Sequence, residues 1–508
     1  MNTAIITNPV MWADVPDVDV IRVGPVFYMV STSMHSMPGC PIMKSENLYD
    51  WEIVNYVYDT FEDHEAHRLE DGQGIYGSGS WAASLRYKDG VYYVCFSSND
   101  MDQFYIYRTG DIEHGPWERS VIPGLHHDPA LLLDEDHRNY VIYGNGDIRI
   151  KELTADLTAV KPGGTDQLLL EGEREDIGLR IEGCHAHKRN GYYYLFFIEW
   201  PRTGNQRRRQ LCYRSRELLG PYEWKVVLDD DLGYQNNGVA QGGIVDTPDG
   251  DWYAVLFQDH GAVGRIPCVL PVSWEQDWPV IGENGAAPKR FQTKLPAGEP
   301  KPVVISDEFD SPSGRLALNW QWNHNPDNGL WSLTERPGYL RLRTGRTADS
   351  ILRARNTLTQ RTEGPACSAE ALLDLSGMLT GDRAGMVALQ NGYGTVEAAA
   401  LEQGGFNLSM CVNSGDGCPQ TVESIPFTGN RLYLRIDFNF EDSVDQAHFF
   451  YSADGAVWKP IGGTLHMKYT LDHFMGYRIG LFNYATVSSG GYADFDYFHY
   501  RRQAKSGT

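Results

Sequence analysis

The sequence lacks the features of several protein classes. No hydrophobic run approaches the roughly 18 apolar residues that a membrane-spanning helix requires. The first residues, MNTAIITNPVMW, have neither the basic stretch nor the apolar core of a signal peptide. The eight cysteines include no CxxC pair, which disfavours a zinc site or a disulfide framework. We therefore expect a cytoplasmic protein with no membrane partner, in which most cysteines are free thiols.

Basic side chains are also scarce. The 508 residues include 44 Lys and Arg against 67 Asp and Glu, a formal net charge of −23. Such a field repels phosphate backbones and anionic lipids, so we expect no nucleic-acid partner. The one basic run, at residues 207–209, is interpreted as solvated surface.

A short segment rich in aromatic and β-branched residues recurs five times. The copies lie at 26–33, 91–98, 139–146, 192–199 and 251–258. Each follows a second apolar strand and a tight-turn signal such as NG or DG, which predicts five hairpins. An ordinary β-sandwich, the alternative, has turns every 8 to 12 residues without a longer period. The spacing of about 48 to 65 residues instead favours an all-β fold with a five-bladed β-propeller over residues 1–295.

The composition changes after the fifth repeat. Residues 296–304 read PAGEPKPVV, a proline-rich and stiff connector. Strands with period-two alternation follow, for example YLRLRT at 339–344 and RLYLRIDFNF at 431–440. We predict a linker over 296–303 and a β-sandwich accessory domain over 304–508.

Polar residues occupy equivalent places in the repeats. Counting back seven or eight positions from the turn of each hairpin reaches Asp17, Trp81, Asp128, Glu182 and Gln241. An isolated aspartate at a strand end more often caps backbone amides. If the innermost strand of each blade lines a central channel, however, these side chains converge into a ring suited to a sugar. Glycoside hydrolysis requires a protonated acid and a carboxylate on opposite faces of the sugar, and a third carboxylate nearby helps to keep the acid protonated.

The motifs around these residues resemble glycoside hydrolase family 43. The resemblance begins with NPVMWADVPDVDVIRVGPVFYMVSTS and continues through WAASLRYKDGVYYV, HDPALLLDEDHRNYVIYGNGDI, EGCHAHKRNGYYYLF and GGIVDTPDGDWYAVLFQDHGAVGRIP. It implies a five-bladed propeller and an inverting hydrolase. ISDEFDSP, WQWNHNPDNGLW and YADFDYF likewise resemble the jelly-roll, concanavalin-like domain of many family 43 β-xylosidases. In those enzymes a loop of the sandwich closes one side of the active-site pocket.

The resemblance implies catalytic roles for three residues. Asp17 matches the general base, Asp128 the carboxylate that orients the acid and tunes its pKa, and Glu182 the general acid. Inversion requires room for a water molecule, so the carboxyl groups of Asp17 and Glu182 are expected roughly 6.5 to 9.5 Å apart.

The resemblance also implies substrate-binding residues. Arg265 matches an arginine that binds a substrate hydroxyl in the −1 subsite, with a strand-end salt bridge as its alternative role. Trp81 and Ala82 resemble the family's hydrophobic wall, and Gln241 completes the ring. Met34 and His35 stand where many relatives carry aromatic residues in the pocket.

A metal site is less clearly indicated. Where many relatives have a calcium-binding histidine in a stretch like GIHQGG, this sequence reads GVAQGG, with Ala240 in its place. His260 is an alternative imidazole for the channel. It fits two interpretations, a largely hydrated Ca²⁺ ion and a histidine hydrogen-bonded only to channel water. No organic cofactor is expected.

Together these features predict an inverting, exo-acting glycoside hydrolase. It is expected to release xylose from the non-reducing ends of xylo-oligosaccharides, with α-L-arabinofuranosidase side activity. A dedicated α-L-arabinofuranosidase is the alternative within the class, because both sugars present similar hydroxyl positions to a small pocket. A non-catalytic carbohydrate-binding protein is the alternative from another class, and the presence of all three acids argues against it. Because cytosolic exo-glycosidases of this size often assemble, a homo-oligomer is a further expectation.

Overall fold

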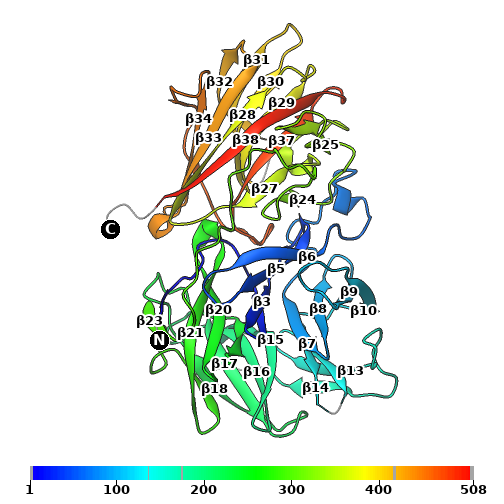
Figure 1. The fold of residues 1–508 in the computed structure, drawn as a ribbon, viewed down its shortest axis with the longest axis vertical. Helices are drawn as coiled ribbons and strands as arrows, with labels where there is room; N and C mark the ends of the chain where they lie inside the picture. The colour runs from blue at the N-terminus through cyan, green and yellow to red at the C-terminus, as the bar shows by residue number, and fades with distance from the viewer. Residues whose placement is uncertain (1–3, 136, 173–175, 416–418, 504–508) are drawn as a thin grey trace.

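The computed structural model describes residues 4–135, 137–172, 176–415 and 419–503. This part of the chain is almost entirely β-structure, interrupted by short 3₁₀ turns at η1 (Ala66–Arg68), η2 (Gly261–Val263), η3 (Ile351–Arg353) and η4 (Glu441–Ser443). The strands form two bodies stacked along the long axis of the molecule (Figure 1). None of the helical turns in the described residues is long and apolar enough to span a membrane.

The amino-terminal body consists of five four-stranded antiparallel sheets. The first and second blades contain β2 (Asp19–Val23), β3 (Val26–Val30), β5 (Gly39–Ser45) and β6 (Glu52–Tyr58), and β7 (Ala83–Lys88), β8 (Val91–Ser98), β9 (Gln103–Thr109) and β10 (Glu118–Pro123), respectively. The third and fourth contain β11 (Ala130–Leu133), β12 (Asn139–Tyr143), β13 (Ile148–Leu153) and β14 (Asp166–Leu170), and β15 (Ile177–Arg189), β16 (Tyr192–Pro201), β17 (Arg209–Ser215) and β18 (Glu223–Leu228). The fifth contains β19 (Gly242–Asp246), β20 (Trp252–Asp259), β21 (Arg265–Glu275) and β22 (Trp278–Ile281). The first strands of the sheets, β2, β7, β11, β15 and β19, contact one another in a closed ring. This arrangement confirms the predicted five-bladed propeller.

The recurring segments of the sequence are the second strands of the blades. Their turns have the backbone that the sequence signals require: Asp89 and Gly90 have φ values of 52° and 84°, and Asn190 and Gly191 have 50° and 74°. Two successive positive φ values are typical of a type I′ hairpin turn. The hairpins are therefore specified locally by their turn residues.

The ring is closed by contacts between the two ends of the propeller chain. Strand β1 (Ala4–Thr7) pairs antiparallel with β23 (Arg290–Thr293). On the inner strands of the first and fifth blades, Arg22 Nη2 lies 2.6 Å from Asp246 Oδ2. Among the described residues each four-stranded blade takes its strands from one segment of the chain, so these contacts contribute to closing the ring.

The carboxyl-terminal body is a sandwich of two antiparallel sheets, which confirms the predicted fold class. One sheet contains β24 (Gln321–Asn323), β27 (Leu358–Arg361), β29 (Asp382–Leu389), β30 (Tyr393–Ala400), β31 (Phe406–Asn413), β32 (Gln420–Phe427) and β37 (Arg478–Ala485), together with β4 (Ser36–Met37). The other contains β25 (Trp331–Ser332), β26 (Leu340–Arg343), β28 (Ala366–Asp374), β33 (Arg431–Asn439), β34 (Gln446–Ser452), β35 (Lys459–Pro460), β36 (Leu465–His466) and β38 (Tyr492–Gln503).

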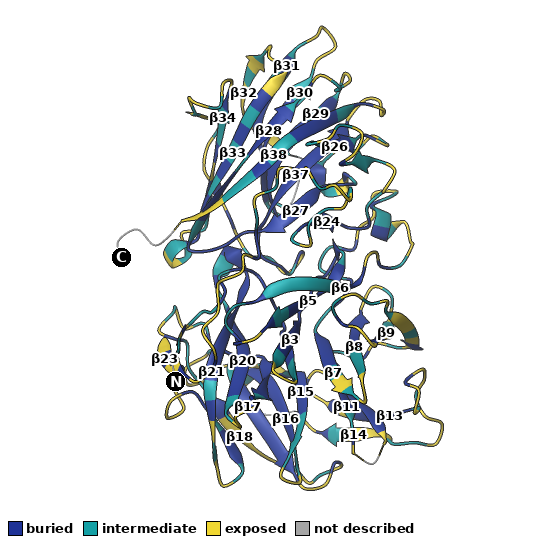
Figure 2. Ribbon diagram, viewed as in Figure 1, coloured by how far each residue is buried: buried dark blue, intermediate teal, exposed yellow. Residues whose placement is uncertain are grey.

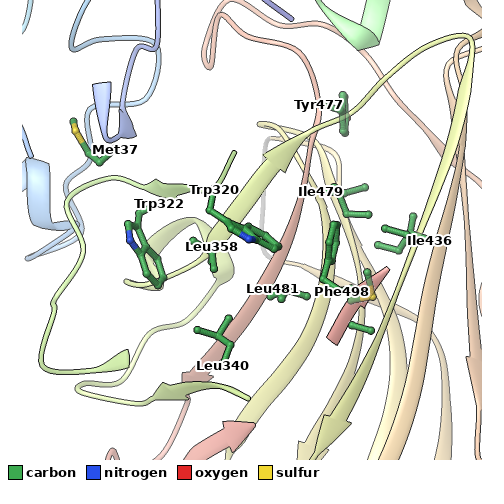
Figure 3. Packing of buried hydrophobic residues seen from close by; sticks show 14 of the residues in the cluster. Met37, Trp320, Trp322, Leu340, Leu358, Ile436, Tyr477, Ile479, Leu481 and Phe498 are labelled. Atoms are coloured by element: carbon green, nitrogen blue, oxygen red, sulfur yellow. The ribbon is translucent and has the colours of Figure 1, made fainter. Parts of the chain in front are cut away.

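The two bodies share a continuous interface. Strand β4 belongs in sequence to the first blade, but it pairs with β24 at the edge of a sandwich sheet. Figure 3 labels Met37 of β4, and Trp322 and Trp320 on the sandwich side; all three belong to one hydrophobic cluster. This hydrophobic cluster extends through both bodies. The predicted domain bounds, 1–295, 296–303 and 304–508, therefore describe the order of the domains along the chain and not separate hydrophobic cores. Those bounds stay predictions.

Burial follows the same pattern, with buried strands in the interior of both bodies and exposed residues concentrated in loops and outer strands (Figure 2). The seven described cysteines are all buried and unbonded, as predicted, and Cys418 lies outside the described residues.

Candidate active site

A cavity of about 210 Å³ lies at the end of the propeller that faces the sandwich. Its lining takes at least one residue from every blade and one, Phe474, from the loop that precedes β37. Most of the predicted site residues line it: Asp17, Trp81, Ala82, Asp128, Glu182, Gln241 and Arg265. The inner strands therefore bring together residues that lie far apart in the sequence.

The lining also includes residues that the sequence interpretation did not assign: His127, Leu179, Ile198, Arg208, Phe257 and Phe474. His127 was identifiable in principle, because it directly precedes Asp128 in the motif HDPAL. Arg208 corrects an expectation, since the basic run at 207–209 is not a solvated surface. Its three arginines are only 14%, 24% and 22% exposed, and each pairs with a carboxylate.

Backbone geometry aims several of these side chains into the cavity. Gln241 directly precedes an inner strand, and Asp17 and Asp128 each lie two residues before one. The φ values of Asp17, Asp128 and Gln241 are 51°, 45° and 71°. Left-handed backbone costs energy in non-glycine residues and is concentrated at functional sites. Glu182 lies within β15, where the pairing with β16 changes register on both sides of it. Such irregularities redirect a side chain away from the regular sheet.

Asp17 forms a buried ion pair with Arg265. The Arg265 Nη1 group donates to both carboxylate oxygens, at 2.8 and 3.0 Å, and the two side chains are only 5% and 7% exposed. Arg265 is fixed in turn by two further contacts: its backbone amide donates to the side-chain oxygen Asp14 Oδ1 at 2.7 Å, and its Nη2 donates to the backbone carbonyl of Phe474 at 3.1 Å. The arginine thus orients Asp17 and connects it to the sandwich.

Asp128 and Glu182 both lie close to His127, whose Nε2 is 3.7 Å from Asp128 Oδ2 and 3.1 Å from Glu182 Oε2. The Gly183 amide donates to Asp128 Oδ2 at 3.0 Å. Burial raises the pKa of Asp128; His127 opposes this rise, while Glu182 and Asp17 add to it. Two groups contact Glu182 Oε2, His127 Nε2 at 3.1 Å and the Asn145 amide. The cavity thus contains one carboxylate paired with an arginine, Asp17, and two carboxylates grouped around His127.

An aromatic wall completes the cavity. Trp81 donates from Nε1 to the Gly77 carbonyl at 3.0 Å, which fixes its ring. The ring edge meets His127 at 5.6 Å and Phe474 at 6.1 Å between centroids. Aromatic faces of this kind bind the apolar faces of sugars.

His35 does not line the cavity, contrary to the prediction that it contacts substrate. Its ring is buried and packs at 4.7 to 5.4 Å from Tyr76, His324 and His473, between the two bodies. The neighbouring Met34 lines the cavity instead. His35 therefore belongs to the interface between the two bodies and not to the cavity lining.

His260 is also displaced from the acids. It borders a separate cavity with Trp12, Tyr234 and Gln258, stacks on the Tyr234 ring at 4.0 Å, and lies 2.8 Å from Gln258 Oε1. His260 therefore does not line the cavity that contains the acids, and its role as a metal ligand stays a prediction.

The channel near the axis instead contains a protein cation. Arg86 Nη1 donates to Asp19 Oδ2 at 2.7 Å, and its Nη2 donates to the Ala186 carbonyl at 3.2 Å. On the other side of Asp19, His185 Nδ1 lies 3.1 Å from Oδ1. A guanidinium repels a divalent cation, so these residues do not fit a calcium ion held in this part of the channel.

In the described residues, one group of His, Asp and Glu is compact enough for an ion, namely His127, Asp128 and Glu182. The Glu182 Oε2 and Asp128 Oδ2 atoms already accept N–H groups from Asn145 and Gly183. We therefore interpret this group as an acid cluster, not as a set of metal ligands.

One end of this propeller brings together three carboxylates, an arginine and an aromatic wall. This combination of fold and site is that of a class of glycoside hydrolases. The comparisons with known proteins agree. The model of glycosyl hydrolases family 43 matches residues 6–279, and the model of the β-xylosidase C-terminal concanavalin A-like domain matches residues 306–501. The chain belongs to glycoside hydrolase family 43 and is a glycoside hydrolase.

Individual relatives cover nearly the whole chain. A β-xylosidase of Formosa agariphila is 31% identical over 97% of this chain and 90% of its own length. A non-reducing end α-L-arabinofuranosidase of Bacteroides ovatus is 25% identical over 97% and 94%. The solved structure of a bifunctional GH43-CE protein of Bacteroides eggerthii is 46% identical with a TM-score of 0.93; it covers 99% of this chain, which spans 64% of that protein.

Proposed function

We propose that this chain is an inverting exo-glycosidase that removes single xylose units, and arabinofuranose units as a second activity, from the non-reducing ends of xylo-oligosaccharides. One observation carries the proposal: Asp17, Asp128 and Glu182 line a single cavity of about 210 Å³. A cavity of this volume suits one sugar unit and not a chain. The substrate class is supported by relatives named β-xylosidase and α-L-arabinofuranosidase.

The chemistry follows from the positions of the three acids. Asp17, held by Arg265, accepts a proton from the water that attacks the anomeric carbon. Glu182 donates a proton to the departing glycosidic oxygen, so the bond breaks as the new C–O bond forms on the opposite face. Asp128 and the Gly183 amide position the acid. The 6.5 to 9.5 Å separation of the Asp17 and Glu182 carboxyl groups, which allows room for the water, stays a prediction.

The exo preference follows from the sandwich. The Phe474 ring closes one side of the cavity, and its carbonyl accepts a hydrogen bond from Arg265. A chain that enters the cavity therefore ends there. The cytoplasmic location and the homo-oligomer stay predictions.

The direct test is hydrolysis of xylobiose and of the p-nitrophenyl β-xyloside and α-L-arabinofuranoside, with the anomer of the first product followed by NMR. We expect release of α-xylose from xylobiose. In Glu182→Gln, turnover of xylobiose should fall by about 10³-fold or more, while binding measured by calorimetry persists. Wild-type protein that binds xylobiose without cleaving it would favour the carbohydrate-binding alternative.

A further inference from the structure

His127 is the one imidazole in the cavity lining of the described residues. Its Nε2 lies 3.1 Å from Glu182 Oε2 and 3.7 Å from Asp128 Oδ2, and its side chain is 22% exposed. The Gly144 amide donates to the His127 carbonyl at 2.9 Å, which fixes the backbone at this point. The ring edge rests against Trp81. The imidazole is thus held on several sides and directed at the acid.

The contact is made to one particular oxygen of Glu182. Both His127 Nε2 and the Asn145 amide reach Oε2, and the described residues place no donor on Oε1. A carboxyl group whose Oε2 accepts hydrogen bonds carries its own proton on Oε1. The other oxygen is then the one available to a glycosidic oxygen in the cavity.

We propose that His127 is a positioning residue for the general acid: by donating from Nε2 to Glu182 Oε2, it presents the Oε1 proton to the leaving group. The inference rests on the proposed function of Glu182 as the acid. His127 does not need to touch the sugar for this role.

The electrostatic surroundings favour a donating Nε2. Burial disfavours the imidazolium, but the charges of Asp128 and Glu182 outweigh it and raise the pKa of His127 to about 9. The charged groups that face the cavity are Asp17, Asp128, Glu182, Arg208 and Arg265, and both arginines are paired with carboxylates. These contacts favour a proton on His127 Nε2, the atom that faces Glu182 Oε2.

The test compares two substrates that differ in their need for an acid. Xylobiose has a poor leaving group that must be protonated, whereas 2,4-dinitrophenyl β-xyloside has a leaving group that departs without a proton. His127→Phe removes the donor and retains an aromatic ring. We expect kcat on xylobiose to fall about 10- to 150-fold, the range for a charge-assisted hydrogen bond, and kcat on the dinitrophenyl substrate to stay within about 3-fold of wild type.

Two further variants separate positioning from a structural effect. His127→Gln keeps an N–H donor without a titrating group, and it should recover most of the lost xylobiose activity while the alkaline limb of the pH profile shifts. His126→Phe alters the neighbouring histidine, which packs between Phe104 and Tyr143 outside the cavity, so any disturbance of the loop should affect both substrates equally.

Equal losses on the two substrates in His127→Phe would overturn the inference, as would the absence of recovery in His127→Gln. The proposed function fails in a different way, namely if the wild-type protein cleaves neither substrate. The two failures are therefore distinguishable in a single set of assays.

Discussion

The role of the sandwich in catalysis can be tested at one side chain, Phe474. Its ring lies 4.7 Å from the Arg265 guanidinium and meets the edge of Trp81 at 6.1 Å. In Phe474→Ala both ring contacts are lost. The hydrogen bond from Arg265 to the Phe474 carbonyl involves only the main chain and can persist.

The magnitude follows from the two contacts. A cation–π contact contributes about 0.5 to 2 kcal/mol and an aromatic pair about 0.5 to 1.5 kcal/mol. Together they amount to about 1 to 3.5 kcal/mol, which corresponds to a decrease of about 5- to 400-fold in kcat/KM. Because the wall contacts the sugar in the ground state as well as the transition state, most of the loss should appear as an increase in KM.

The assay is steady-state hydrolysis of xylobiose and xylotetraose, with the melting temperature measured in parallel. Leu471→Ala is the matched control, because Leu471 lies in the same loop but is 74% exposed and does not line the cavity. We expect the control to retain wild-type kinetics. If Phe474→Ala folds normally and its kcat/KM stays within 2-fold of wild type, the sandwich does not form a functional wall of the site.

Four further predictions concern charge, pH, metal and the interface. Arg265→Met leaves the Asp17 carboxylate buried without its partner, so kcat should fall at least about 100-fold and the melting temperature should also fall, with partial recovery in Arg265→Lys. Burial lowers the pKa of His35 to about 3 and the pKa values of His324 and His473 well below their usual range, so below about pH 6.5 the unfolded chain binds more protons than the folded one at these three residues. The free energy of unfolding, measured by urea titration, should therefore fall as the pH decreases from 6.5 toward 4. Hydrolysis rates should not change when EDTA is added, because Arg86 supplies the channel cation, whereas loss of activity restored by Ca²⁺ would contradict this reasoning. In Gly476→Ala the new Cβ would lie 2.2 Å from the Val263 carbonyl, so the Phe474 loop must shift and kcat/KM should fall more than in the exposed-loop control Leu471→Ala.

The features that were predictable from the sequence are those that depend on local signals. The Asn190–Gly191 and Asp89–Gly90 turns mark hairpins, and a regular hairpin spacing defines blades. Because each inner strand starts at the same end of the ring, residues at equivalent distances from the turns, such as Asp17 and Asp128, had to converge. The convergence of the acids was therefore accessible without coordinates.

The remaining features depend on packing between distant segments, which leaves no periodic signal. Phe474 reaches the cavity only because the loop before β37 folds back onto the propeller, where the Gly476 amide donates to Asp14 Oδ2 at 2.9 Å. His35 has an obvious sequence position beside Met34 but turns into the interface toward His324 and His473. Met34 has a left-handed backbone, with a φ of 49°, and His35 lies in a turn, so no strand periodicity indicated which of the two neighbours faces the cavity.

Two buried carboxylates near the propeller axis are neutralised by arginines from other blades. Asp17 of the first blade is paired with Arg265 of the fifth, and Asp19 of the first is paired with Arg86 of the second. Each buried carboxylate would be costly alone, since an unpaired charge in the interior has no solvent to compensate it. In these two pairs the partner comes from a different blade, so the contacts that neutralise Asp17 and Asp19 also join the blades across the ring. The catalytic geometry and the closure of the propeller are therefore one set of interactions, and a substitution that weakens either should be detected in both activity and stability.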